Sequence, residues 1–436
     1  MRNIFLLVIV SMVFYAYGQK RLPLVYNKIG INSTPADAPI KMTLFKRFQH
    51  RTSKTSDPND VYDTDIYSPK SATYLASKQK LYIQSLEGYE TIVYDMNTFR
   101  KIKVIRHTFK AGQQPLFGDK HTVFDYTYKR RKSNFNIFSG KPVESCLSHK
   151  GKYLWVTYYR RSYDANAESP SAVAIIDTDS DEIVRVMPTG PLPKMIAASP
   201  DNKYIAVTHW GDNTIGLIDI DSEDINDFKY VKHFVVDYRV TLDFGGKKKV
   251  NRDNNCGYCL RGTVFTPDSK YLLVGRMGGG GIATFDMESK TYLGTTFGMK
   301  TNLRHLLIRD GYIYISTNST GYVQKAVLAD FLTKRLNTSK KNNRFEAWES
   351  CSVGRGARTI VVSNSGKYIF ACVNSGSKIV AIDAKTMKIV ATVPADSFPV
   401  GMAITDDDRY LVITSQGRSY GGGHSVMIYR LAFTEK

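Results

Sequence analysis

The chain repeats one short pattern of apolar and polar positions. Three clear copies run over 191–221, 259–288 and 356–385. Each copy reads as an apolar strand, a polar hairpin that ends in Lys-Tyr, a second apolar strand, a Gly- or Asn-containing turn, and a third strand that ends at Asp. A repeated unit that forms one small antiparallel sheet is typical of a solenoid or a propeller.

Aligning the chain on the residue that opens the second strand extends the pattern to seven copies. The copies are centred on Leu81–Tyr82, Tyr153, Tyr204, Tyr271, Tyr312, Tyr368 and Tyr410. In five of them the third strand ends at an acidic residue, namely Asp95, Asp177, Asp219, Asp286 and Asp383. A fourth, outer strand follows in most copies, as in 182–187 and 388–393. We therefore predict an all-β fold, a seven-bladed β-propeller of four-stranded antiparallel blades, with six or eight blades as the alternatives.

The two ends of the chain together predict how the ring closes. The last copy ends at 424–433, with too little sequence after it for an outer strand. The early segment 40–48 has the pattern of such a strand. Pairing the two ends would remove an open sheet edge. We expect an N-terminal segment over 19–70 that contains the closing strand, followed by the propeller over 71–436.

One phrase of the repeat carries a resemblance to a known family. The sequence A-x-SPD-x-KY, an apolar strand and GDNTIGLID (197–219) resembles the YVTN-type repeat of the YncE-like and surface-layer-associated seven-bladed β-propellers. The likeness covers roughly residues 70–430. It implies a propeller fold, and the activities among such relatives are diverse: periplasmic binding proteins, lactonase-like enzymes and the heavy subunit of quinone-cofactor amine dehydrogenases.

The first 18 residues are typical of a secretory signal peptide. Arg2 precedes an apolar core that runs from Ile4 to Val13, and small residues follow at Ala16 and Gly18, so we expect cleavage before Gln19. The apolar stretch is too short to span a bilayer, which takes about 20 residues. We therefore expect an exported protein with no membrane span, located in the periplasm or at the cell surface or outside the cell.

The long insertions are predicted to gather on one face of the disc. In a four-stranded blade, the loop between strands two and three and the connection to the next blade open on the same side. Residues 106–140, 159–171, 238–258 and 416–423 occupy such positions, and we expect 327–350, before Cys351, to feed the same face. Loops on a rigid scaffold commonly carry binding chemistry.

The charge balance points to anionic ligands. Lys and Arg number 60 against 40 Asp and Glu, a formal net charge of +20. We expect four cationic side chains at the channel mouth, where the innermost strands begin, with three more residues beside them. The four are Lys194, Arg261, Arg304 and Arg358, and the three neighbours are His209, Trp210 and Arg276. They would bind carboxylate, phosphate or sulfate, or alternatively pair with acidic side chains such as Glu144 and Asp212.

Further basic residues are predicted farther out on the same face. They are Lys129, Arg130, Arg131, Lys132, Arg160, Arg161, Lys247, Lys248 and Lys249. Such a surface favours an envelope protein or an anionic polymer as the partner, with nucleic acid less favoured. We expect a monomeric propeller or a subunit of a larger complex.

The cysteines predict a disulfide and no cofactor. Cys256 and Cys259 form a C-x-x-C motif, but Leu260 stands where haem c attachment needs His. We expect a disulfide within the motif or from one of its cysteines to Cys351, with a redox-active pair or a zinc site as the weaker alternatives. Cys146 and Cys372 fall inside strands and are expected to be buried.

No catalytic motif, metal site or cofactor site is predicted. The histidines are scattered, and no nucleophile elbow or phosphate-binding loop occurs. The sequence therefore favours a non-catalytic binding or scaffolding propeller whose basic face engages a partner. The alternative is a lactonase- or lyase-type enzyme that acts on a small anionic substrate at the channel mouth.

Overall fold

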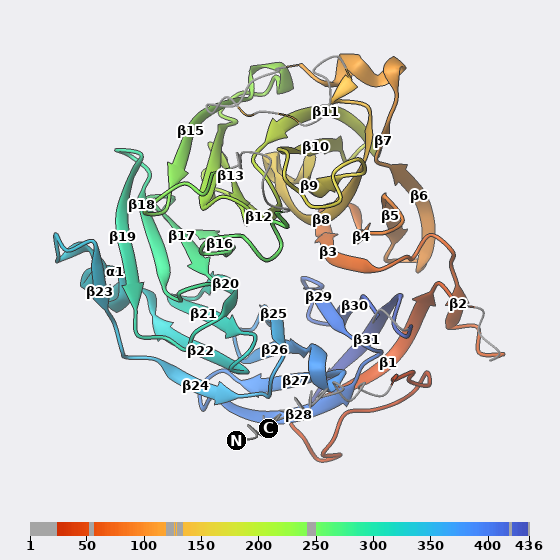
Figure 1. The fold of residues 1–436 in the computed structure, drawn as a ribbon. Coiled ribbons are helices and arrows are strands. Elements are labelled where there is room, and N and C mark those ends of the chain that lie inside the picture. The colour runs from red at the N-terminus through yellow and green to blue at the C-terminus, as the bar shows by residue number, and fades with distance from the viewer. Residues whose placement is uncertain are drawn as a thin grey trace, which may run out of the picture.

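Seven sheets surround a common axis in the computed structural model, which describes residues 24–51, 56–118, 126, 128, 134–241, 250–417 and 421–434. Figure 1 looks down this axis, with one strand of each sheet at the centre and the fourth at the rim. The four core strands of each blade are antiparallel. The predicted all-β, seven-bladed propeller is confirmed.

The strands of each blade follow the chain from the centre to the rim. Blade one contains Pro69–Leu75 (β3), Lys80–Ser85 (β4), Glu90–Asp95 (β5) and Arg100–Arg106 (β6). Blade two contains Phe138–Ser148 (β8), Tyr153–Arg161 (β9), Ser171–Asp177 (β10) and Glu182–Thr189 (β11). Blade three contains Pro193–Ala198 (β12), Tyr204–His209 (β13), Thr214–Asp219 (β14) and Lys229–Val235 (β15). Blade four contains Leu260–Phe265 (β16), Tyr271–Arg276 (β17), Ile282–Asp286 (β18) and Thr291–Phe297 (β19).

Blades five to seven continue in the same order. Blade five contains Leu303–Arg309 (β20), Tyr312–Thr317 (β21), Tyr322–Val327 (β22) and Glu349–Ser352 (β24). Blade six contains Ala357–Val362 (β25), Tyr368–Val373 (β26), Lys378–Asp383 (β27) and Lys388–Pro394 (β28). Blade seven contains Pro399–Ile404 (β29), Tyr410–Ser415 (β30), Ser425–Phe433 (β31) and Ile40–Gln49 (β1). Short edge strands add Asp60–Tyr62 (β2), Thr108–Phe109 (β7) and Asn342–Arg344 (β23).

The repeated hairpin has a local hydrogen-bonding reason. A hydroxyl near the end of the first strand accepts a hydrogen bond from the amide N–H of the Tyr that opens the second strand. The acceptors are Ser199, Thr266, Ser363 and Thr405, at 2.9, 3.0, 3.1 and 3.0 Å. Side-chain acceptors of this kind fix a tight turn, which explains why the phrase recurs with constant spacing.

The second and third strands are apolar on both sides because each blade packs face to face with two others. In β13, Ile205 and Val207 join a core cluster with Trp155 of blade two. Ala206, which points the other way, joins a cluster with Leu272 of blade four. Such strands lose the usual alternation of apolar and polar residues because neither side meets water.

The ring closes as predicted. Strand β1 pairs antiparallel with β31 from Ile40–Phe433 to Gln49–Ser425 and so becomes the outer strand of blade seven. At the centre, each first strand contacts the first strands of the two adjacent blades, in the order β3, β8, β12, β16, β20, β25, β29 and back to β3. The sheet edge expected from the sequence is therefore covered by the N-terminal segment.

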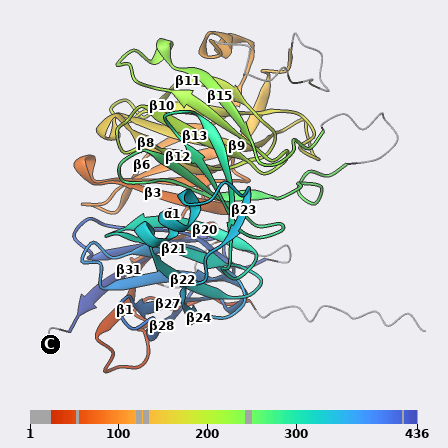
Figure 2. The same ribbon diagram turned by 90° about the vertical axis from the view of Figure 1, so that its left-hand side faces the viewer.

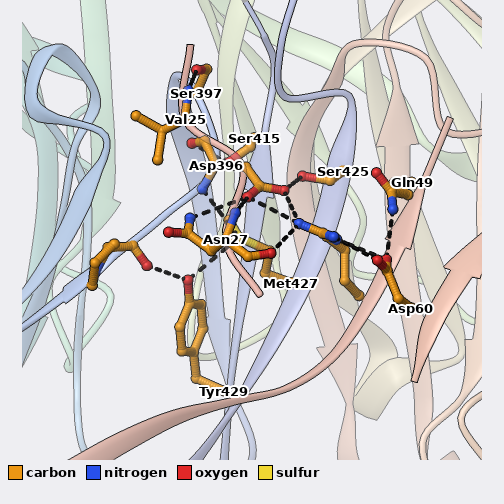
Figure 3. Close-up of polar contacts among 12 residues, drawn as sticks. Val25, Asn27, Gln49, Asp60, Asp396, Ser397, Ser415, Ser425, Met427 and Tyr429 are labelled. Atoms are coloured by element: carbon orange, nitrogen blue, oxygen red, sulfur yellow. Dashed lines mark hydrogen bonds and ion pairs between the residues drawn. The ribbon is translucent and has the colours of Figure 1, made fainter. Parts of the chain in front are cut away.

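A buried polar network holds this closure together (Figure 3). The Arg47 guanidinium on β1 donates to both carboxylate oxygens of Asp60, at 2.9 and 2.7 Å, and to Asp396 at 3.2 Å. Asp396 also accepts hydrogen bonds from the Asn27 amide, at 3.0 Å, and from the Ser425 hydroxyl, at 2.8 Å. We call Arg47, Asp60 and Asp396 the closure triad.

The insertion over 327–350 lies apart from the others, so the expectation that it feeds the same face is wrong. Residues 328–348 join the third strand of blade five to its fourth, so this connection begins on the face opposite the loops between strands two and three. It contains Leu328–Leu336 (α1) and then β23, which pairs in parallel with β19 of blade four. In Figure 1, α1 and β23 lie at the outer rim beside β19, away from the axis.

Breaking the closure triad should destabilise the protein strongly. Arg47→Met leaves two carboxylates whose side chains are each 1% exposed without their cation, a change that typically costs about 3–5 kcal/mol. The control is Lys103→Met, which breaks the exposed Lys103–Glu182 pair at 3.6 Å and should cost less than about 1 kcal/mol. Urea unfolding of both variants measures the difference, and equal small losses would contradict the role assigned to the triad.

Candidate functional site

Five cationic side chains converge where the first strands begin. Each is the second residue of its strand: Lys70 on β3, Lys194 on β12, Arg261 on β16, Arg304 on β20 and Arg358 on β25. The first strands are neighbours around the axis, so these residues form one group, which we call the axial cations. The structure brings together the four that the sequence singled out and adds Lys70.

Burial and mutual repulsion both act on the axial cations. Burial, followed by the charges of Arg358, Arg304 and Arg261, lowers the pKa of Lys70 well below its usual value. Burial and the neighbouring arginines likewise lower the pKa of Arg304 and of Arg358. Like charges in a poorly solvated site destabilise one another unless an anion compensates.

Only part of this charge is compensated within the described residues. Glu144 of β8 accepts a hydrogen bond from Arg261 at 2.9 Å, so the sequence correctly proposed it as an internal partner. Burial raises the pKa of Glu144, against the attraction of Arg261. Lys70 donates to the neutral Gln416 amide oxygen at 3.2 Å. Arg304 contacts the Met277 sulfur at 3.3 Å, with no carboxylate partner in the described part of the chain.

Lys194 makes contacts of its own at the edge of the group. Its ammonium lies 3.8 Å from the centre of the Trp210 ring and 3.0 Å from a carboxylate oxygen of Asp253. The Tyr159 hydroxyl donates to the same Asp253 oxygen. Burial, opposed by Asp253 and reinforced by Arg261, lowers the pKa of Lys194 to about 7. Trp210 therefore lies beside the axial cations, as expected.

His209 and Arg276 are interior residues of their blades. His209 is fully buried and contacts the hydroxyls of Thr189 and Thr214 at 2.7 and 2.8 Å. Burial lowers its pKa well below the usual value. Arg276 is 4% exposed, stacks 3.5 Å from the centre of the Tyr258 ring and pairs with Asp237 at 3.3 Å. Both ring nitrogens of His209 and the Nη1 of Arg276 therefore contact neighbouring side chains other than the axial cations.

Three insertions are connected to one another above the axial cations. Asp253, from 238–258, contacts Tyr159 and Arg160, which begin the insertion in blade two. The amide of Arg252 donates to the Asn166 carbonyl at 3.0 Å. The Arg239 guanidinium lies 4.7 Å from the centre of the ring of Tyr126, which belongs to the 106–140 insertion. Figure 2 shows the ring edge-on, with yellow-green loops of the middle blades gathered on the right-hand side.

The outer basic residues have different positions. Lys129–Lys132 and Lys247–Lys249 lie outside the described residues. Arg160 is partly exposed and pairs with Asp253 at 3.7 Å. Arg161 is 1% exposed, donates to the Phe135 carbonyl and lies 4.3 Å from the centre of the Phe138 ring. Arg161 is therefore an interior residue that anchors the 106–140 insertion.

The disulfide joins the two cysteines of the C-x-x-C motif, Cys256 and Cys259. The alternative pairing with Cys351 is wrong, because Cys351 is a free, buried thiol on β24 that packs in the core between blades five and six. The disulfide packs against Trp210 and so supports the loop that holds Asp253 over Lys194. Cys146 and Cys372 are free thiols within strands; Cys372 is fully buried, as expected, whereas Cys146 is only partly buried.

Among the described residues, no group of three or more His, Cys, Asp or Glu side chains is placed to hold a metal ion. No helix in the described ranges has the length and apolar character needed to cross a membrane.

Comparison with known proteins supports the fold. No family model matches this sequence, and no curated protein matches it. Hydrazine synthase of Kuenenia stuttgartiensis is similar in structure with a TM-score of 0.57 and 13% identity over 88% of this chain and 100% of that chain. The Cps50 (Swd1) β-propeller domain of Myceliophteria thermophila has a TM-score of 0.57 and 10% identity over 84% and 96% of the two chains. A chain of the mitotic checkpoint complex has a TM-score of 0.57 and 10% identity, over 95% and 100%.

Removal of a positive charge should change the free energy of unfolding in opposite directions at the axial cations and inside a blade. Arg304→Met removes repulsion from the axial cations and should raise the free energy of unfolding, on the order of 1 kcal/mol. Arg276→Met leaves Asp237 without one of its cations and should lower it by about 1–3 kcal/mol. Urea unfolding without added anions tests both, and a loss of stability in Arg304→Met would contradict the uncompensated charge.

Proposed function

We propose that this protein is an anion-binding propeller that engages an acidic partner through its insertion-bearing face. The observation that carries the proposal is the excess of positive charge at the axis, where, among the residues that the structure describes, five cations face the two carboxylates of Glu144 and Asp253. A carboxylate or phosphate group of a ligand would relieve this repulsion, and arginine is well suited to bind such groups.

The fold and the comparisons support a role in binding. Propellers present loops on a rigid scaffold, and one structurally similar chain belongs to the mitotic checkpoint complex. We infer that the YVTN-like repeats, the signal peptide over 1–18 and the basic loops serve one common function. The protein would then be exported to the periplasm or cell surface and bind an envelope protein or an anionic polymer there.

The affinity for a small anion should fall as pH rises. Burial lowers the pKa of Lys194 from 10.5 to about 7, and a bound anion would raise it again, so binding takes up protons above about pH 7. Calorimetric titration with glutarate should give about threefold to tenfold tighter binding at about pH 6 than at about pH 9. Lys194→Met should lose part of this dependence, whereas an affinity that rises with pH would contradict the proposal.

Without a bound anion, the titration of Lys194 should make the protein more stable as pH rises. Between about pH 7 and its ordinary value of 10.5, Lys194 binds fewer protons in the folded state than in the unfolded state. The free energy of unfolding should therefore rise with pH across this window. Thermal unfolding at several pH values, with and without glutarate, separates the two effects.

The outer loops should strengthen binding of acidic polymers. Replacing Lys247–Lys249 by Ser should weaken binding of a fluorescent poly-glutamate peptide about tenfold at low salt and reduce its salt dependence. The matched control replaces three exposed lysines on the opposite face, Lys367 and Lys385 in turns between strands and Lys388 at the start of β28. Equal losses in both variants would show that net charge alone matters, and would contradict a specific binding face.

A lactonase- or lyase-type enzyme is the second candidate. Lys194, with a pKa lowered to about 7, contacts Asp253 beside the axial arginines, and a general base near neutral pH suits proton abstraction from a bound anion. Turnover of a small anionic substrate, lost in Lys194→Met but retained in the Lys247–Lys249 variant, would favour this enzyme over a scaffold.

A further inference from the structure

We propose that Lys70 forms a Schiff base with the carbonyl carbon of a 2-oxo acid whose carboxylate is held by Arg304 and Arg358. This inference rests on the anion-binding part of the proposed function and is independent of any macromolecular partner. It adds a covalent step and names the chemical class of the ligand.

The position of Lys70 is that of a reactive amine. It is the second residue of β3 and is partly exposed. Its ammonium group hydrogen-bonds the neutral Gln416 oxygen at 3.2 Å, and it has no carboxylate partner within the described residues. A lysine placed among other cations is held neutral more easily, because the neighbouring charges disfavour its protonation, and a neutral amine is the nucleophile in Schiff-base chemistry.

Lys194 is a weaker candidate for the same reaction. Its ammonium is 3.0 Å from the Asp253 carboxylate and 3.8 Å from the centre of the Trp210 ring. Both contacts favour the charged form and cover the nitrogen. Lys70 lacks both kinds of contact in the described part of the chain, so its lone pair is better placed to attack a ligand.

The arginines near Lys70 define the ligand. Arg261, Arg304 and Arg358 occupy the same position as Lys70 on first strands that surround one axis. Arg261 is engaged by Glu144 at 2.9 Å. Arg304 and Arg358 have no ion pair within the described ranges and can bind a carboxylate. A carbonyl directly attached to that carboxylate would then face the Lys70 amine, which is the arrangement of a 2-oxo acid.

The reaction balances with groups that are present. The Lys70 nitrogen attacks the carbonyl carbon, so that an N–C bond forms and the carbonyl oxygen becomes a hydroxyl by taking a proton from the attacking nitrogen. A second proton, taken from solvent at this partly exposed position, lets this hydroxyl leave as water and gives a protonated imine. No oxidation or reduction takes place, and water reverses the reaction.

Reductive trapping tests the inference on the intact mature protein. The protein is incubated with 2-oxoglutarate and sodium cyanoborohydride, which reduces an imine to a stable secondary amine, and the modified peptides are identified by mass spectrometry. We expect one adduct per chain, with Lys70 modified at least about tenfold more than any exposed lysine such as Lys203. Modification of surface lysines alone would overturn the inference.

Two controls separate this inference from anion binding itself. Binding of 2-hydroxyglutarate, which has the same carboxylates but no carbonyl, is measured by the rise in melting temperature. Stabilisation by 2-hydroxyglutarate without a Lys70 adduct from 2-oxoglutarate overturns the Schiff base and retains anion binding. Neither stabilisation nor adduct overturns both.

Lys70→Arg provides the matched variant. Arginine carries a fixed positive charge and no nucleophilic amine, so this variant should bind 2-hydroxyglutarate at least as tightly as the wild type, and it should lose the trapped adduct at this position. A wild-type level of single-site trapping in Lys70→Arg would show that another amine reacts and would overturn the assignment.

Discussion

The structure depends on closure of the ring between its two ends. Strand β1 pairs with β31 across nearly the whole length of the sequence, and the buried closure triad joins the same two regions. The blades pack face to face, so an open ring would expose apolar surface on two blades and leave a free sheet edge. Such distant pairing is slow to form, but once made it fixes all seven first strands around one axis.

Closure also determines the chemistry of the site. Lys70 belongs to blade one and Arg358 to blade six, and they become neighbours only because blade seven joins the two ends of the ring. Blade seven itself places the uncharged Val400 at the equivalent position, the second residue of its first strand. The energy gained by closing the ring therefore offsets the repulsion among cations, which is a common trade between stability and function.

The repeat made most of the fold predictable. One tight turn, in which a backbone N–H donates to a side-chain hydroxyl, recurs at constant spacing and sets where the second strand begins. The same spacing predicted Lys194, Arg261 and Arg358, which each lie ten residues before the Tyr that opens the second strand. Arg304 lies eight residues before Tyr312, because the hairpin of blade five is shorter. The spacing missed Lys70 because blade one was aligned on Leu81–Tyr82, whereas β4 begins at Lys80, and counting ten residues back from Lys80 reaches Lys70.

The burial of individual side chains was harder to predict than their position along a strand. Spacing along a strand gives the position of Arg161 or His209, but it does not show whether neighbouring loops cover the side chain. Arg161 is enclosed by the 106–140 insertion. Its contacts with Phe135 and Phe138 depend on tertiary packing. The pairing of Cys256 likewise depended on the path of 328–348, which leaves Cys351 in the core of the blades.

The distribution of charge around the axis is asymmetric, and this asymmetry defines where a ligand would sit. The compensated cations, Lys194 and Arg261, lie on blades three and four, where the insertions supply Asp253 and blade two supplies Glu144. The remaining three cations lie on blades five, six and one, which contribute no acidic partner in the described residues. The field of the axial group is therefore strongest on the side away from the Asp253 loop. An anion attracted to that side would contact Arg304, Arg358 and Lys70 together, while the loops of blades two to four would bound it on the other side.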